Sequence, residues 1–87
     1  MFIHLGQNTS VNKKDIIGIF DLDTSTVSIH TRNFLKQAEK KNQVVNVSYE
    51  LPKSFVVTAT DKKNTKVYIS QLAASTLEKR SENIYKE

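Results

Sequence analysis

Two aspartates that directly follow an apolar run are the residues of this sequence best suited to catalysis. Residues 16–20 read Ile-Ile-Gly-Ile-Phe, and Asp21, Leu22, Asp23, Thr24 and Ser25 come next. A carboxylate at the end of a buried strand can attack a phosphoryl group, and a second one nearby can act as acid and base. Such chemistry also needs a magnesium ion to neutralise the charge of the phosphate. The pattern therefore raises phosphoryl transfer as the first hypothesis.

The rest of the chain does not supply the other parts of such an enzyme. The segment resembles the first motif of haloacid-dehalogenase-type phosphatases, which need a domain of roughly 200 residues, and this chain has 87. Later strands should add acidic metal ligands, yet Asp61 is the only aspartate after Asp23. The alternative is that the Asp and Thr side chains turn the chain and cap the next helix. We favour this alternative and expect neither enzymatic activity nor a cofactor.

Residues for metal binding and nucleophilic catalysis are also sparse. The chain has two histidines and no cysteine, whereas a metal site or a catalytic triad needs two or three converging groups. His4 falls in a predicted strand and His30 at a predicted helix start, without a partner at metal-ligand spacing. The serines have no base at a recognisable spacing, and two glycines cannot form a glycine-rich phosphate loop. We expect no metal site.

Basic side chains remain as candidates, because they occur where a phosphate backbone is usually contacted. They fall at predicted strand ends, at hairpin tips and on the first helix: Lys13, Lys14, Arg32, Lys53, Lys62, Lys63 and Lys66. Any soluble protein places solvated charge at the same positions. The net charge of +4 is shared evenly between the two halves of the chain, so it permits nucleic-acid binding without indicating it. Neither a helix-turn-helix layout nor the aromatic-basic motif of an RNA-recognition sheet is visible.

Length and composition predict one small folded domain, residues 1–87. The 87 residues are 38% apolar and 25% charged, which is typical of a globular protein. No apolar run approaches the roughly 20 residues that span a bilayer, and the first residues lack the basic start of a secretory signal. The lack of cysteine fits a reducing compartment. We therefore expect a cytoplasmic protein without a membrane partner.

Alternation of apolar and polar residues predicts about five strands. They cover residues 1–5, 15–20, 45–49, 55–60 and 67–70. The last three are predicted to form an antiparallel meander. The strand at 15–20 is nearly all apolar and has no proline, so we expect it to be central and covered on both faces. Residues 6–12 are expected to be a polar turn region.

Two helices complete the pattern. The first spans about 29–41, with Phe34, Leu35 and Ala38 as its apolar stripe and Asn42 in the left-handed position after its end. The second begins near Thr76, where Ser75 and Glu78 have the spacing of a capping box. The order predicts an α+β domain with one mostly antiparallel sheet, a helix packed on it between the second and third strands, and a C-terminal helix.

Five segments together resemble a known family. They are MFIHLG (1–6), DIIGIFD (15–21), PKSFVV (52–57), VYIS (67–70) and STLEKR (75–80). In this order they resemble the RemA/RemB family, small extracellular-matrix (biofilm) regulators of Gram-positive, Bacillus-type bacteria, and they are closer to the RemB branch. The resemblance covers almost the whole chain.

The resemblance implies a DNA-binding transcriptional regulator that assembles into a closed ring and presents basic residues to duplex DNA. It also implies that a paralogous regulator can be a partner. The basic residue that precedes the second strand in the RemA branch matches Lys14. An arginine pair of that branch falls on Leu51 and Pro52, which are not basic, and Lys53 is the nearest cation.

A ring also has a physical motive. A small sheet has exposed edges that must be paired or covered, and Phe2, Phe20 and Tyr85 are more aromatic surface than one small core can hide. Head-to-tail packing would solve both problems, whereas the alternative is a monomer whose aromatic residues all enter its own core. We predict a non-enzymatic, ring-like homo-oligomer that contacts DNA through the basic residues above. The alternative function is a protein-interaction module that partners another regulator without binding DNA.

Overall fold

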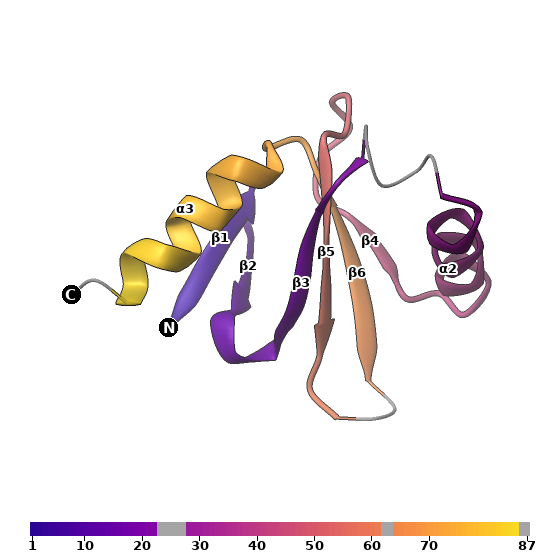
Figure 1. Ribbon diagram of the computed structural model, residues 1–87, viewed down its shortest axis with the longest axis horizontal. Helices are drawn as coiled ribbons and strands as arrows, with labels where there is room; N and C mark the ends of the chain where they lie inside the picture. The colour runs from indigo at the N-terminus through magenta and orange to yellow at the C-terminus, as the bar shows by residue number, and fades with distance from the viewer. Residues whose placement is uncertain (23–27, 62–63, 86–87) are drawn as a thin grey trace.

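The computed structural model describes residues 1–22, 28–61 and 64–85, with side chains in the last helix as far as Ser81. The chain begins with β1 (Phe2–Gly6), β2 (Thr9–Asn12), the one-turn 3₁₀ helix η1 (Lys13–Asp15) and β3 (Ile16–Asp21). It continues with α2 (Ile29–Lys40), β4 (Val44–Asn46), β5 (Ser54–Ala59), β6 (Thr65–Ser70) and α3 (Ala74–Tyr85). The result is a small α+β domain, as predicted, shown in Figure 1.

The strands form two sheets instead of one sheet of about five strands. A four-stranded sheet has the order β3-β5-β6-β4, and β1 pairs with β2 in a separate hairpin. Neighbouring strands are antiparallel except for β4, which runs parallel to β6. The hairpin and α3 lie on one side of the four-stranded sheet, and α2 lies on the other (Figure 1).

Alternation along β5 gives the sheet two apolar faces, each with its own core. On the first face Val56 packs with Ile3 and Leu5 of the hairpin and with Leu77 of α3. On the second face a smaller cluster forms under α2 and consists of Ala38, Phe55, Val57 and Val67. Successive side chains of a strand point to opposite faces, so one run of apolar residues serves both cores.

The strand β3 is an edge strand, which corrects the prediction that residues 15–20 are central and covered on both faces. Its register with β5 shifts between Ile16 and Gly18, as in a bulge, and Ile17 is left exposed. Beyond the shift, Phe20 faces the second core and stacks on Phe55 with ring centroids 5.0 Å apart. A Cβ at Gly18 would lie 2.6 Å from the Phe20 ring, so a larger residue there would force that ring to shift from its position. Residues 16–20 are apolar because the strand places side chains partly buried on both faces of the sheet, although the strand itself lies at the sheet edge.

Two other predictions about strands are also wrong. Residues 6–12 contain β2, because Gly6 and Gln7 reverse the chain with φ values of 122° and 49°. The first strand of the expected meander is β4, and it pairs with β6 in parallel instead of with β5. Residues 47–53 cross the end of β6, where the amides of Val47 and Lys53 donate to Ile69 and Ser70. A direct hairpin would have needed a connection of about two to five residues.

The predictions for the two helices agree with the structure more closely than those for the strands. The helix α2 begins at Ile29 after Ser28, whose hydroxyl accepts a hydrogen bond from the His30 amide, and it ends one residue before the predicted end. Asn42 has the predicted left-handed backbone, with φ 57°. The helix α3 begins at Ala74, so Ser75 lies within its first turn and the predicted N-cap at Ser75 is wrong.

Candidate nucleic-acid interface

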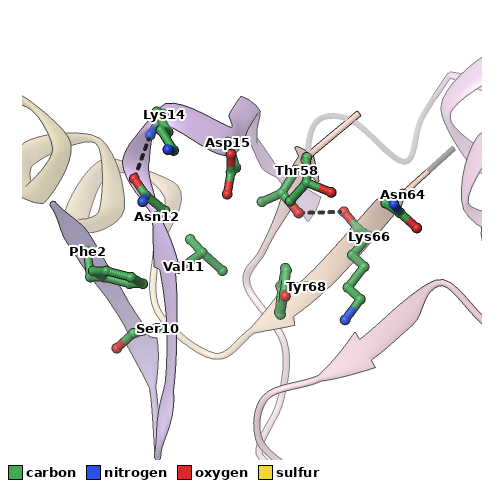
Figure 2. A pocket seen from close by; sticks show the side chains of 11 residues that line it. Phe2, Ser10, Val11, Asn12, Lys14, Asp15, Thr58, Asn64, Lys66 and Tyr68 are labelled. Atoms are coloured by element: carbon green, nitrogen blue, oxygen red, sulfur yellow. Dashed lines mark hydrogen bonds between the residues drawn. The ribbon is translucent and has the colours of Figure 1, made fainter. Parts of the chain in front are cut away.

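Two of the predicted basic residues, Lys14 and Lys66, come together at one groove. The groove has a volume of about 700 Å³ and lies between the β1–β2 hairpin and the first face of the sheet. Phe2, Val11 and Tyr68 line it, and Figure 2 shows Val11 between the two aromatic rings. Lys14 and Lys66 are 52 positions apart in sequence, and only the placement of the hairpin over the sheet unites them. We refer to this hollow as the basic groove.

Local structure fixes the position of Lys14. The side-chain oxygen of Asn12 accepts a hydrogen bond of 3.2 Å from the Lys14 amide and so caps η1. This single turn ends the hairpin and brings both Lys14 and Asp15 to the groove. Capping of an unsatisfied amide by a short polar side chain is the usual way in which such a turn begins.

Strand alternation fixes the position of Lys66. Lys66 and Tyr68 lie on the first face of β6, while Val67 between them enters the second core. Lys66 is opposite Thr58 of β5, and the Thr58 hydroxyl donates to its carbonyl over 3.5 Å. The groove thus combines two lysines with one aspartate, Asp15, and this balance favours a ligand with modest negative charge.

The other predicted basic residues lie elsewhere. Lys53 precedes β5 at the end of the strand remote from Lys66, and Arg32 lies on α2, which covers the second face. Lys62 and Lys63 are outside the described residues. The structure therefore unites Lys14 and Lys66 but does not unite Lys53 or Arg32 with them.

Lys13 points to the C-terminal helix. Its ammonium group donates a hydrogen bond of 2.7 Å to the carbonyl of Ser81 in α3. Close by, a guanidinium nitrogen of Arg80 donates over 2.8 Å to the carbonyl of His4 in β1. Cations that bind carbonyls late in a helix also interact favourably with its dipole. Lys13 thus fastens α3 over the hairpin, a role that no sequence pattern indicated.

A second hollow is apolar. It has a volume of about 340 Å³ and lies between α2 and the second face of the sheet, lined mainly by Ile17, Phe20, Phe34, Phe55 and Val57. Ile17 is 66% exposed, and Phe20 and Phe34 are partly exposed. We refer to this hollow as the apolar groove. The exposure of Phe20 and of Phe2 agrees with the expectation that aromatic surface exceeds what one core can hide, while the Tyr85 side chain lies outside the described residues.

The catalytic alternative finds no added support. Asp21 ends β3, and the remainder of the Asp-rich motif, residues 23–25, lies outside the described residues. A ring nitrogen of His4 is 2.6 Å from the Gln7 carbonyl. Among residues 1–22, 28–61 and 64–85, no three His, Cys, Asp or Glu side chains gather as metal ligands would. In the same part of the chain, no helix combines the length and apolarity needed to cross a membrane.

Sequence reasoning missed the uncharged half of the basic groove. Phe2, Asn12 and Tyr68 line it. Phe2 was expected only as surplus aromatic surface for subunit contacts, and Asn12 and Tyr68 looked like ordinary turn and strand residues. One signal was available for Phe2, since alternation placed it opposite the buried Ile3 in an edge hairpin. No local sequence pattern indicated that Tyr68 of the four-stranded sheet would lie across the groove from Phe2 of the hairpin.

Comparison with known proteins agrees with the resemblance noted from the sequence. A family model named RemA-like, described as extracellular matrix regulatory protein A-like, matches residues 2–80. Extracellular matrix regulatory protein B of Bacillus subtilis (strain 168) is 39% identical over 85 residues, which cover 98% of this chain and 95% of that protein. The matched region includes every strand, both grooves and most of α3.

Proposed function

This chain belongs to the RemA-like family of extracellular matrix regulatory proteins, and we propose that it is a non-enzymatic transcriptional regulator of biofilm and extracellular-matrix genes. In this proposal it acts in the cytoplasm as a ring-like homo-oligomer and binds duplex DNA by electrostatic contacts. The observation that carries the proposal is the similarity to extracellular matrix regulatory protein B over nearly the full length of both chains.

The basic groove supports the proposed DNA contact. Lys14 and Lys66 are exposed cations on two sides of one hollow, and Lys14 matches the basic position that the family resemblance implies. Lys53 and Arg32 are further proposed contacts, because both are exposed. Lys62 and Lys63 stay in the proposal on sequence grounds alone, and Lys13 is its weakest member because its ammonium group already binds α3.

The proposed mode of binding is many weak contacts. Leu51 and Pro52 stand where the resemblance implies an arginine pair, and both are exposed. Lysine binds phosphate as a point charge, without the two-pronged geometry of arginine. A single subunit should therefore bind weakly, and linked subunits that engage one duplex would supply the missing affinity through effective concentration.

The apolar groove and the sheet edges support the proposed homo-oligomer. The edge strands β3 and β4 each have one side without a strand partner in the described chain. Exposed edges and exposed apolar side chains are commonly covered by association. A contact between unlike surfaces of successive subunits closes into a ring when the rotation permits.

The test is titration of a labelled duplex of about 30 base pairs with the purified protein at low and at moderate salt. We expect binding that falls steeply with salt, because contacts to phosphates release counterions. Replacing both Lys14 and Lys66 by Ala should weaken binding by about tenfold or more and reduce the salt slope by about two. No binding at low salt by a folded sample would contradict DNA binding.

The matched control is Lys36→Ala with Lys79→Ala. Both side chains are exposed, neither lines the basic groove, and the double variant loses the same charge. It should bind DNA more tightly than the groove variant. Equal affinities would mean that net charge alone governs binding and that the groove has no special role.

One observation favours a second candidate function. The apolar groove has a mainly apolar lining and a volume within the range of small binding sites. A protein-interaction module that binds another regulator, such as a paralogue, would use such a surface. Capture of that regulator from nuclease-treated extract, combined with no duplex binding at low salt, would favour this function over the first.

A further inference from the structure

We propose that the basic groove binds a nucleotide, with the base against Phe2 and Tyr68 and a single phosphate between Lys14 and Lys66. The volume of about 700 Å³ lies within the roughly 300–1,000 Å³ typical of small-molecule sites. The site does not depend on duplex binding, so it stands or falls separately from the proposed function.

The aromatic half of the groove comes from both sheets. Phe2 is 68% exposed at the mouth, although residues 3 and 5 of the same strand are almost fully buried. Tyr68 is half-buried and lies across the groove on β6, and the Val11 side chain lies between the two rings in Figure 2. An aromatic ring held in solvent beside an apolar floor is a stacking surface for a planar ring, as in nucleic-acid-binding modules.

The cationic half supplies the contact for phosphate. Figure 2 shows Lys14 of η1 and Lys66 of β6 on opposite sides of the groove. Both side chains are exposed and flexible, so rotation about their side-chain bonds would let both ammonium groups reach one anion. Charge-assisted hydrogen bonds of this kind are about twice as strong as neutral ones. The phosphate and the base would therefore be recognised by different sides of the hollow.

Asp15 narrows the class of ligand. Its carboxylate lies in the same groove and would repel additional phosphates, but it can accept hydrogen bonds from a base amino group or a ribose hydroxyl. The side-chain oxygen of Asn12 accepts the Lys14 amide, so the free side of that side chain is its amino donor. Together these groups favour a nucleoside monophosphate over a triphosphate, and over a bare phosphate that lacks the base.

The site has a regulatory consequence that rests on the proposed function. Lys14 and Lys66 cannot hold a nucleotide phosphate and a DNA phosphate at the same time. If the duplex uses these lysines, then a bound nucleotide should weaken duplex binding in proportion to its own occupancy. Such competition between a nucleotide and DNA for the same two lysines would regulate DNA binding without a change of fold.

The test is calorimetric titration of the full chain, without DNA, with AMP, adenosine, ribose 5-phosphate, ATP and a single-stranded oligomer of ten deoxyadenosines. We expect saturable AMP binding that is tighter than binding of adenosine or ribose 5-phosphate, because only AMP engages both halves of the groove. Phe2→Ala should weaken AMP binding by roughly tenfold, the scale of one lost stacking contact. Lys14→Ala with Lys66→Ala should abolish the preference for AMP over adenosine.

Matched controls use the same residue types outside the groove. Tyr49→Ala removes an exposed aromatic ring, and Lys36→Ala with Lys79→Ala removes two exposed charges. Both should leave AMP binding unchanged. Binding of the oligomer alone, lost in Phe2→Ala, would keep the nucleotide chemistry but identify the source as an unpaired strand. No saturable binding of either ligand, or equal losses in the control variants, would overturn the proposal.

Discussion

The two faces of the central sheet are covered in different ways. The first face is closed by the β1–β2 hairpin and α3, and side chains fasten the layers together. The hydroxyl of Ser70 donates over 2.6 Å to the Leu5 carbonyl, and that of Ser54 donates over 2.7 Å to the Leu72 carbonyl. In the described chain the second face is covered mainly by α2, whose one buried side chain is Ala38, and Leu22 packs against the same core.

This difference suggests separate roles: the first face stabilises the fold, and the second face offers apolar surface for association. Leu77 of α3 is fully buried, whereas Phe34 of α2 is 42% exposed although both belong to apolar stripes. A closed face contributes free energy of folding through burial of apolar area. An open face keeps apolar area in contact with water, and a partner can bury it later. We therefore expect damage to the first face to unfold the protein and damage to the second to change its assembly.

The largest expected effect is on the first face. Leu77→Ala should lower the free energy of unfolding by about 2–5 kcal/mol, because it removes a fully buried side chain and leaves a cavity. The corresponding change on the second face, Phe34→Ala, should cost clearly less because its ring is already partly in water. Urea unfolding of both variants measures the contrast. Equal losses would break the comparison between the faces.

A smaller effect is expected from the hydroxyl that joins the layers of the first face. The buried Ser70 hydroxyl donates to the Leu5 carbonyl and accepts from the Leu72 amide over 3.0 Å. Ser70→Ala leaves both groups unsatisfied, so we expect a loss of about 1–3 kcal/mol in thermal or urea unfolding. Ser75→Ala is the control, since that side chain is exposed. A loss no greater than in the control would mean that packing alone holds the layers.

The smallest expected effect on stability is at the edge of the second face. Ile17→Ser should change the free energy of unfolding by no more than about 0.5 kcal/mol, because the side chain is mostly in solvent. The same change should reduce the mass of the assembly in analytical ultracentrifugation if the apolar groove is a subunit contact. Leu51→Ser, at another exposed apolar position, serves as the control. An unchanged mass for Ile17→Ser would remove this groove from the proposed oligomer.

Local sequence patterns predicted much of the fold. The bounds of α2 and the left-handed Asn42 follow from the preferences of neighbouring residues, so the sequence predicted them well. Alternation of side chains along a strand also explains why Phe55 and Val57 enter one core and Val56 enters the other. These features depend on side chains within a few positions of one another.

The errors about strand placement share one main cause, which is pairing between distant segments. The apolar strand at residues 15–20 looked central, but an edge strand with a bulge at Ile17 has nearly the same composition. The strand β2 has a single buried apolar residue, Val11, so its alternation was too short to recognise. Whether β4 pairs with β5 or with β6 depends on the path of residues 47–53, and no periodicity encodes that path.

The sequence by itself determined the class of the domain, the faces of its strands and the set of basic residues, since periodicity, capping and charge are local properties. Tertiary structure decided which of those residues lie together. Lys14 and Lys66 share a groove only because the hairpin lies over the first face of the sheet, while Lys13 is drawn to α3. Strand order and the stacking of layers depend on burying apolar area between segments far apart in the chain, so the candidate site appears only when the layers are in place.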